Sequence, residues 1–381
     1  ILWIGMICIL SIISIHKYIP SLFPISQTYG AFHYIHEMRR ISQKHEQNIS
    51  RFRIYTPVSE AMPQKLPGTV IVIIGESATR DRMKAFTPSY PSETTPWLSE
   101  MKETPYFYLM DKTYSCFPVT VPALSMFLYG RNQYDHRNID DVANIIDVAH
   151  LSGYKTWWMS NQGKMSGEDS PIDFVAQNCD TEQRTPFPLG DDYQLLDFVK
   201  QLPKNENNFV IIHLMGSHIR YSDRTPPDFK GIDNPKHDKR TNQYDTTLLY
   251  TDHLLRDIYT YAKDHLNLQV MMYCSDHGEN MERSHVASKN MTYDMVRIPF
   301  FIYLSPAYTQ LYPDTAQALR QNEHKVFTND LMYDTISGIL HLPNTDYEPK
   351  FDLSSDTYDL KPADARTKYG EWTILDDPDY K

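Results

Sequence analysis

The chain has 381 residues, enough for one large domain or two ordinary ones. Acidic residues outnumber basic ones by 48 to 37, the formal net charge is −11, and no basic run of five residues occurs, so we expect no nucleic-acid partner. Four cysteines are too few for a disulfide-rich scaffold, and their spacing matches no zinc knuckle.

The chain opens with an apolar segment without charged residues, ILWIGMICILSIISI. It lacks the basic start and small-residue cleavage site of a signal peptide. We therefore expect residues 1–17 to be the end of a transmembrane helix, with a buried core helix as the alternative. We expect residues 18–65 to be an interfacial linker, in which the charged, proline-free stretch 28–53 predicts an amphipathic helix on the membrane surface.

From about residue 66 onwards, short apolar runs alternate with helical stretches. The expected strands are 69–75, 154–161, 209–216, 268–275 and 298–305. The expected helices are 144–153, 192–202 and 245–265, and the long polar loops are 162–190, 220–243 and 278–297. This alternation predicts an α/β domain over residues 66–381, with a mostly parallel sheet covered by helices on both faces.

Polar side chains follow four of the expected strands. They are Glu76, Asn161, His218 and the pair Asp276–His277. One polar strand end is explained by an ordinary capping turn. Because ligands bind beyond the carboxyl ends of the strands in open α/β sheets, four such ends at one edge predict a functional site.

Three of these residues, Glu76, Asp276 and His277, offer the oxygen and imidazole ligands that zinc accepts, and leave a coordination position open. A hydroxyl bound at that position loses its proton more easily. Thr120 is the candidate hydroxyl, because it lies just before VPALSMFL at an expected helix start, where negative charge is stabilised. The alternative interpretation of Thr120 is a plain helix N-cap.

Other side chains leave alternatives open. Ser115, Ser125 and Thr113 are the other candidate hydroxyls in this segment. His213, inside an apolar run, is interpreted as a core histidine. Cys116 and Cys179 both lie beside polar loops and could pair in an oxidising compartment, which the residues do not decide.

Four motifs together resemble the phosphoethanolamine transferases, inner-membrane enzymes of the alkaline phosphatase/sulfatase superfamily. The motifs are GESATR (75–80), SCFPVTVPALS (115–125), HLMGSHIRY (213–221) and SDHGEN (275–280). They stand in the family's order, and the resemblance runs from about residue 18 to beyond 340. It implies the superfamily's fold, a membrane domain ahead of residue 1, and a catalytic domain in the periplasm.

The resemblance also implies roles for individual residues. Glu76, Asp276 and His277 correspond to zinc ligands, and Thr120 to the threonine that both coordinates zinc and becomes phosphorylated. The residues implied on the substrate side, where the two histidines could instead hold a second zinc, are His218, His285, Asn161 and Lys164. Glu279 and Glu282 compete with His285 for this role, because the loop before His285 is shorter than usual.

The segment around Thr120 departs from the family pattern. Lipid A-directed members usually carry a second cysteine after the nucleophile and several disulfides, whereas SCFPVTVPALS has one cysteine. The low number of cysteines in this chain more closely resembles the branch of the family that modifies the core sugars of lipopolysaccharide. In an oxidising periplasm we predict that Cys116 and Cys179 form a disulfide.

The predicted function is zinc-dependent transfer of phosphoethanolamine from phosphatidylethanolamine to a glycolipid or glycan acceptor, by a monomer, through a covalent intermediate on Thr120. One alternative is a phosphatase or sulfatase of the same superfamily. The sulfatase motif CxPxR is incomplete here, because Thr120 stands where its arginine belongs. The other alternative is a non-catalytic, membrane-tethered binding module.

Overall fold

The computed structural model of the chain describes residues 25–52, 67–135, 137–163, 170–186, 191–282 and 291–380. Several sequence predictions lie outside these residues: the transmembrane segment 1–17, and the substrate-side residues Lys164 and His285. Within the described part of the chain, no helix is both long enough and apolar enough to cross a membrane.

A seven-stranded sheet forms the centre of the fold, with strand order β2-β8-β7-β1-β6-β4-β5. Its strands are β1 Thr69–Gly75, β2 Phe107–Leu109, β4 Lys155–Ser160, β5 Thr181–Arg184, β6 Asn208–His213, β7 Leu268–Ser275 and β8 Phe300–Leu304. Strand β1 pairs in parallel with both β6 and β7, and only β8 runs against its neighbours β7 and β2. The predicted mostly parallel sheet is confirmed.

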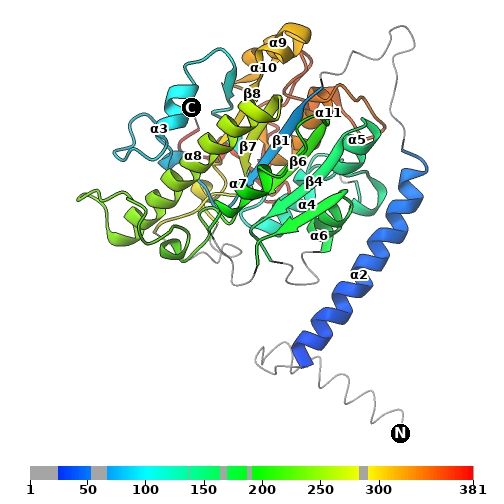
Figure 1. Cartoon of the computed structure of the whole chain (residues 1–381), viewed down its shortest axis with the longest axis horizontal. Coiled ribbons are helices and arrows are strands. Elements are labelled where there is room, and N and C mark those ends of the chain that lie inside the picture. The colour runs from blue at the N-terminus through cyan, green and yellow to red at the C-terminus, as the bar shows by residue number, and fades with distance from the viewer. Residues whose placement is uncertain are drawn as a thin grey trace.

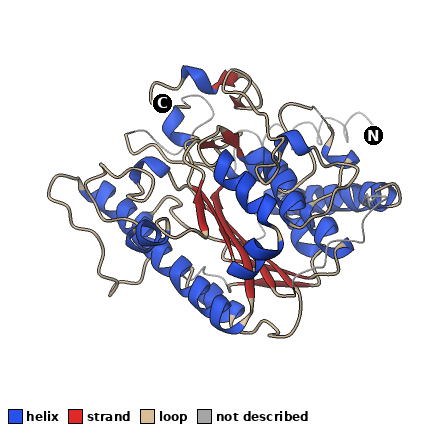
Figure 2. Cartoon of the chain, turned by 90° about the horizontal axis from the view of Figure 1, so that it is seen from above, coloured by secondary structure: helices blue, strands red, loops and turns tan. Residues whose placement is uncertain are grey.

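Helices cover both faces of this sheet (Figures 1 and 2). On one face lie α3 Pro96–Met101, α7 Gln194–Val199 and α8 Lys239–His265, which contribute to one hydrophobic core. The second core contains residues of α4 Thr120–Phe127, α5 Ile145–Leu151, α6 Ser170–Gln177, α9 Pro306–Leu311, α10 Pro313–Asn322 and α11 Met332–Ile339. Two small sheets complete the fold, formed by β3 Thr113–Tyr114 with β9 Phe327–Thr328 and by β10 Arg366–Thr367 with β11 Trp372–Thr373.

Strand β1 shows why its sequence, TVIVIIG, belongs at the centre of this arrangement. Val70, Val72 and Ile74 face one core, whereas Ile71 and Ile73 face the other. Successive side chains of a strand point to opposite faces, so a run that is apolar at every position is stable only with both faces covered. Burying the run therefore fixes β1 inside the sheet and brings its carboxyl end, with Glu76, to the middle of one edge.

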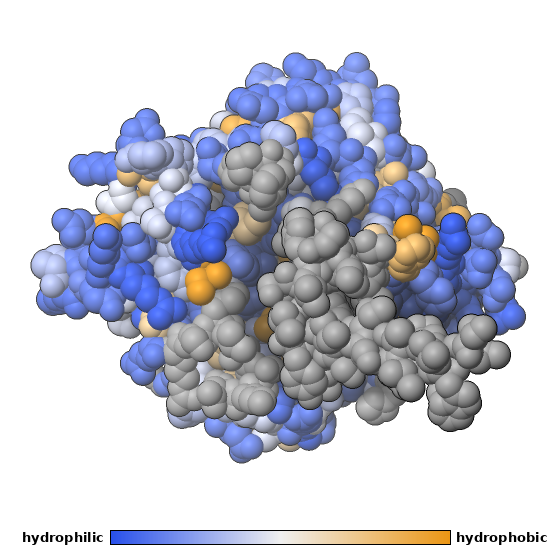
Figure 3. Space-filling view, turned by 90° about the horizontal axis from the view of Figure 1, so that it is seen from below, coloured by the Kyte–Doolittle hydropathy of each residue, from blue (hydrophilic) through white to orange (hydrophobic). Residues whose placement is uncertain are grey.

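A long helix, α2 (Ile25–Ile49), precedes the central sheet in the chain. Its carboxyl-terminal part lies beside the α/β body, and its start projects beyond that body (Figure 1). It contacts α6, and His45 Nε2 lies 2.8 Å from Asp147 Oδ1. Near its start, Phe32 and Ile35 are 69% and 45% exposed. The coloured part of the face seen in Figure 3 is largely hydrophilic, with a few small hydrophobic patches. The helix expected over 28–53 is therefore present, shifted by about one turn towards the N-terminus.

Two expectations about local structure were wrong. The segment 162–190, expected to be a polar loop, contains α6 and β5, because its apolar residues Ile172 and Val175 pack into the core. Cys116 and Cys179 are free thiols rather than a disulfide. The buried Cys116 thiol lies 3.9 Å from the carbonyl oxygen of Ala123 in α4. The half-buried Cys179 thiol lies 3.5 Å from the carbonyl of Val175 in α6, so the two thiols have different surroundings.

Candidate active site

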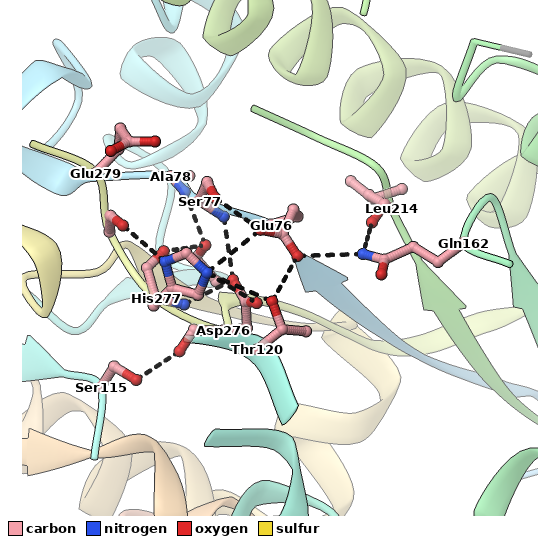
Figure 4. Close-up of polar contacts among 12 residues, drawn as sticks. Glu76, Ser77, Ala78, Ser115, Thr120, Gln162, Leu214, Asp276, His277 and Glu279 are labelled. Carbon is pink, nitrogen blue, oxygen red and sulfur yellow. Dashed lines mark hydrogen bonds and ion pairs between the residues drawn. The ribbon is translucent and has the colours of Figure 1, made fainter. Parts of the chain in front are cut away.

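The site lies at the carboxyl ends of β1 and β7, which are neighbours in the sheet. Their register places Gly75 opposite Ser275, and the Asp276 amide donates a hydrogen bond of 3.0 Å to the Gly75 carbonyl. Glu76 and the pair Asp276–His277 therefore leave the sheet side by side. All three side chains are buried, and Figure 4 shows them converging.

Their potential ligand atoms form a compact cluster, in which all lie within 4.8 Å of one another. His277 Nε2 is 3.3 Å from Glu76 Oε1 and 3.6 Å from Asp276 Oδ2. The other ring nitrogen, Nδ1, lies 2.7 Å from the Gly278 carbonyl, which accepts its hydrogen bond and so orients Nε2 towards the two carboxylates, where it can bind a cation. Asp276 Oδ2 is buried and accepts no hydrogen bond from any described residue.

Thr120 joins this cluster as the first residue of α4. Its hydroxyl donates to Glu76 Oε2 over 3.0 Å and lies 3.4 Å from His277 Nε2. Helix α4 is capped by Val119, and no side chain accepts a hydrogen bond from its first amides. The plain N-cap interpretation of Thr120 therefore does not hold, because its hydroxyl faces the cluster instead of the helix.

The other candidate hydroxyls make structural hydrogen bonds. Ser115 is buried and donates to the Asp276 carbonyl over 2.5 Å, which ties the segment before α4 to the end of β7. Ser125 donates to the Val121 carbonyl one turn back in α4, and Thr113 donates to the Met110 carbonyl. Among the described contacts of these four hydroxyls, that of Thr120 alone reaches the side-chain ligand atoms of the cluster, whereas Ser115 reaches only the main chain of Asp276.

Ser77 holds both carboxylates of the cluster. Its hydroxyl donates to Glu76 Oε1 over 2.6 Å, and its amide donates to Asp276 Oδ1 over 3.1 Å. Ser77 has a φ of 55°, an uncommon conformation for a residue other than glycine. Tyr244 of α8 supports this turn, because its hydroxyl donates to the Ser77 carbonyl and accepts from the Thr79 amide.

Burial and mutual charge set the ionisation of the cluster. Burial opposes ionisation of Glu76, but the hydrogen bond and charge of His277 outweigh it and hold its pKa well below the usual range. Burial and the neighbouring Glu76 charge raise the pKa of Asp276 to about 7. For His277 burial acts in the opposite direction, yet the Asp276 charge and the Glu76 hydrogen bond raise its pKa to about 10. The carboxylates thus favour a positive charge between them.

These observations fit a divalent zinc ion. Two buried carboxylates, an imidazole with Nε2 directed inward and a hydroxyl make a four-donor set of the kind zinc takes. The buried Asp276 oxygen without a hydrogen-bond donor is accounted for by a cation ligated there.

Gln162 is a site residue that the sequence did not single out. Its side-chain amide donates to Glu76 Oε2 over 3.2 Å and to the Leu214 carbonyl over 2.8 Å. Its neighbour Asn161, the predicted substrate-side residue, is buried and donates to Asp192 Oδ1 over 2.8 Å. The sequence thus identified the polar residues after β4, but it is Gln162, not Asn161, that contacts the cluster.

The remaining predicted residues lie around the cluster. His218 is half-buried two residues after Gly216, and its charge favours the ionised form of Glu76. Glu279 is buried and accepts a hydrogen bond of 3.0 Å from the Tyr221 hydroxyl. Glu282 is exposed and, with Glu279, lines a groove of about 650 Å³.

Comparison with known proteins adds a family and several relatives. The sulfatase family model matches residues 68–342. The phosphoethanolamine transferase EptC of Escherichia coli (strain K12) is 25% identical over 307 residues, which is 74% of this chain and 52% of the relative. The chain therefore spans about half the length of this relative.

Two solved structures share the fold. The C-terminal periplasmic domain of EptC from Escherichia coli, in complex with Zn, has a TM-score of 0.70 at 23% identity and covers 86% of this chain and 97% of that domain. The integral membrane protein lipooligosaccharide phosphoethanolamine transferase A from Neisseria meningitidis has a TM-score of 0.62 at 20% identity, over 92% of this chain and 69% of that one.

Proposed function

The chain belongs to the sulfatase family, and we propose that it transfers phosphoethanolamine from phosphatidylethanolamine to a glycolipid or glycan acceptor. The observation on which this rests is the Thr120 hydroxyl, which is directed at a buried cluster of two carboxylates and an imidazole. A stabilising N-cap would not need this cluster, whereas a nucleophile would. Relatives named as phosphoethanolamine transferases, among them EptC and OpgE of Escherichia coli and EptA of Salmonella typhimurium, support the same reaction.

In the first step the Thr120 oxygen attacks the phosphorus of the donor phosphodiester. The new bond joins Thr120 Oγ1 to phosphorus as the hydroxyl loses its proton, and the bond from phosphorus to the glycerol oxygen breaks. The glycerol oxygen takes up a proton, so that diacylglycerol leaves. Thr120 donates its hydrogen bond to Glu76 Oε2, which places an acceptor for its proton 3.0 Å away. In the second step an oxygen of the acceptor hydroxyl or phosphate bonds to the same phosphorus, the bond from phosphorus to Thr120 Oγ1 breaks, and Thr120 takes up a proton again.

The start of α4 assists the attack. Thr120 is the first residue of an eight-residue helix, whose partial positive charge at that end stabilises the alkoxide and the phosphoryl group. Glu76, Thr120, Asp276 and His277 would hold the zinc ion. When bound, zinc would lower the pKa of the hydroxyl and neutralise charge on the phosphoryl oxygens.

We assign the substrate side to the residues around the cluster. His218 would hold the donor phosphate, together with His285 and Lys164, which lie outside the described residues. Gln162 donates both of its amide protons within the protein, to Glu76 Oε2 and to the Leu214 carbonyl, so it would position Glu76 without binding the phosphate. Asn161 would support them indirectly, through Asp192.

The proposal includes a place at the inner membrane. Residues 1–17 would end a transmembrane helix, 18–65 would be the interfacial linker, and 66–381 the periplasmic catalytic domain of a monomer. The exposed Phe32 and Ile35 near the start of α2 support contact of this linker with lipid. The solved relatives named above are a periplasmic domain and an integral membrane protein.

The test is to replace the nucleophile. Thr120→Ala should lower transfer at least about a thousandfold while the protein stays folded, and Thr120→Ser, which keeps a hydroxyl, should retain measurable transfer. After incubation with labelled phosphatidylethanolamine, peptide mass mapping should find phosphoethanolamine on Thr120. Modification of Ser115 instead would identify Ser115, and not Thr120, as the nucleophile. Release of free phosphoethanolamine with no transfer to any envelope glycolipid would favour a hydrolase.

A further inference from the structure

A buried carboxylate outside the cluster, Asp192, is the centre of a hydrogen-bond network behind the site. Asp192 lies two residues before α7 and is 5% exposed. Its Oδ1 accepts from Asn161 Nδ2 over 2.8 Å and from the Met215 amide over 2.9 Å, and its Oδ2 accepts from the Gly216 amide over 2.8 Å. An ionised carboxylate, which only accepts hydrogen bonds, matches these three donors.

The two amides belong to residues 214–217, the β6 loop, which packs against Glu76. The Ser217 amide donates to the Glu76 carbonyl over 2.9 Å. The Leu214 carbonyl accepts from Gln162 Nε2, and the same nitrogen reaches Glu76 Oε2. The β6 loop thus supports Glu76 at its main chain directly and at its carboxylate through Gln162.

We propose that Asp192 is the positioning residue of this site: by holding the β6 loop, it fixes Glu76 and Gln162 in the geometry that binds zinc. This rests on the proposed function, in which Glu76 is a zinc ligand. Asp192 has no described contact with Thr120, Asp276 or His277, so it acts through the β6 loop and through Asn161, the neighbour of Gln162. Asn161 in turn donates a hydrogen bond to Asp192, so it would help to position the site without contacting the substrate.

The test is the zinc affinity of the Asp192→Asn variant. An amide nitrogen cannot accept, so at least one backbone donor of the β6 loop would lose its partner. We expect zinc to bind 10- to 100-fold more weakly, as is typical when a residue behind the ligands is changed. Competition of the purified protein with a chromophoric zinc chelator measures this without any turnover.

The matched control is Asp252→Asn. Asp252 is a fully buried carboxylate of α8 that accepts from the Trp97 and Leu98 amides over 2.8 and 3.1 Å, at the start of α3. This variant should lose stability to urea as Asp192→Asn does but bind zinc like the unmodified protein. An equal loss of zinc affinity in both variants, or none in Asp192→Asn, would overturn the inference.

Three further cases complete the test. If Asp192→Asn does not fold, Asn161→Ala removes one of the three donors; zinc binding weakened several-fold supports the inference, and unchanged binding contradicts it. If the unmodified protein binds no zinc, the proposed function fails, and the inference fails with it. If the unmodified protein and Asp192→Asn bind zinc equally well, only the inference about Asp192 is overturned, and the proposed function stands.

Discussion

Gly216→Ala is a direct test of how closely the β6 loop must approach Glu76. Gly216 has a φ of 47°, in the left-handed region. A Cβ atom there would lie 2.9 Å from the Glu76 carbonyl oxygen and 3.0 Å from its amide nitrogen. Both contacts are with backbone, so the substitution must move either the loop or the ligand-bearing residue.

The loss of stability expected for Gly216→Ala has two parts. An L-residue in the left-handed conformation costs about 1–2 kcal/mol. The overlap with the Glu76 backbone adds about 1–3 kcal/mol, the usual range for overpacking. We therefore expect the free energy of unfolding without zinc to fall by about 2–5 kcal/mol, and zinc affinity to fall by about tenfold or more because Glu76 is displaced.

Gly370→Ala is the matched control. Gly370 has a φ of 87°, and a Cβ atom there would have no atom within 4 Å. It therefore carries the conformational cost without the overlap, and the effect on the unfolded chain is common to both variants. Urea unfolding and chelator competition on the two proteins separate the two parts. Equal losses of stability, with zinc affinity unchanged in both, would refute the close contact with Glu76.

Two further predictions follow from buried groups. Burial lowers the pKa of His213, which packs edge-on against Trp158, to about 4. Because the pKa in the unfolded chain is about 6.5, folding favours the neutral ring, and about 3 kcal/mol of stability present above pH 6.5 is lost as the pH falls to about 4. Urea unfolding at pH 7.5 and 4.5 should show a smaller acid loss for His213→Phe; an equal loss would contradict this assignment. Separately, thiol labelling of the unreduced, denatured protein should modify Cys116 and Cys179. If neither residue is labelled, the two form the disulfide expected from the sequence.

The sequence was sufficient for five of the seven strands of the central sheet and for the convergence of Glu76, Asp276 and His277. Runs such as TVIVIIG and LQVMMYCS are stable only when both faces are buried, so they had to lie inside a sheet. Parallel neighbours end at the same edge, and Glu76, Asp276 and His277 follow their strands directly. Their convergence therefore depends on little besides burial and strand direction.

Side-chain direction and partners further along the chain were decided by the tertiary structure. Asn161 and Gln162 are adjacent and both polar, and only the way the chain leaves β4 turns Gln162 to Glu76 and Asn161 to Asp192. Asp192 itself precedes a different helix, and no spacing in the sequence relates it to Gly216. A local pattern records which residues are buried, but the partner of a buried polar group is set by packing between distant segments, where donor and acceptor must meet within about 3 Å.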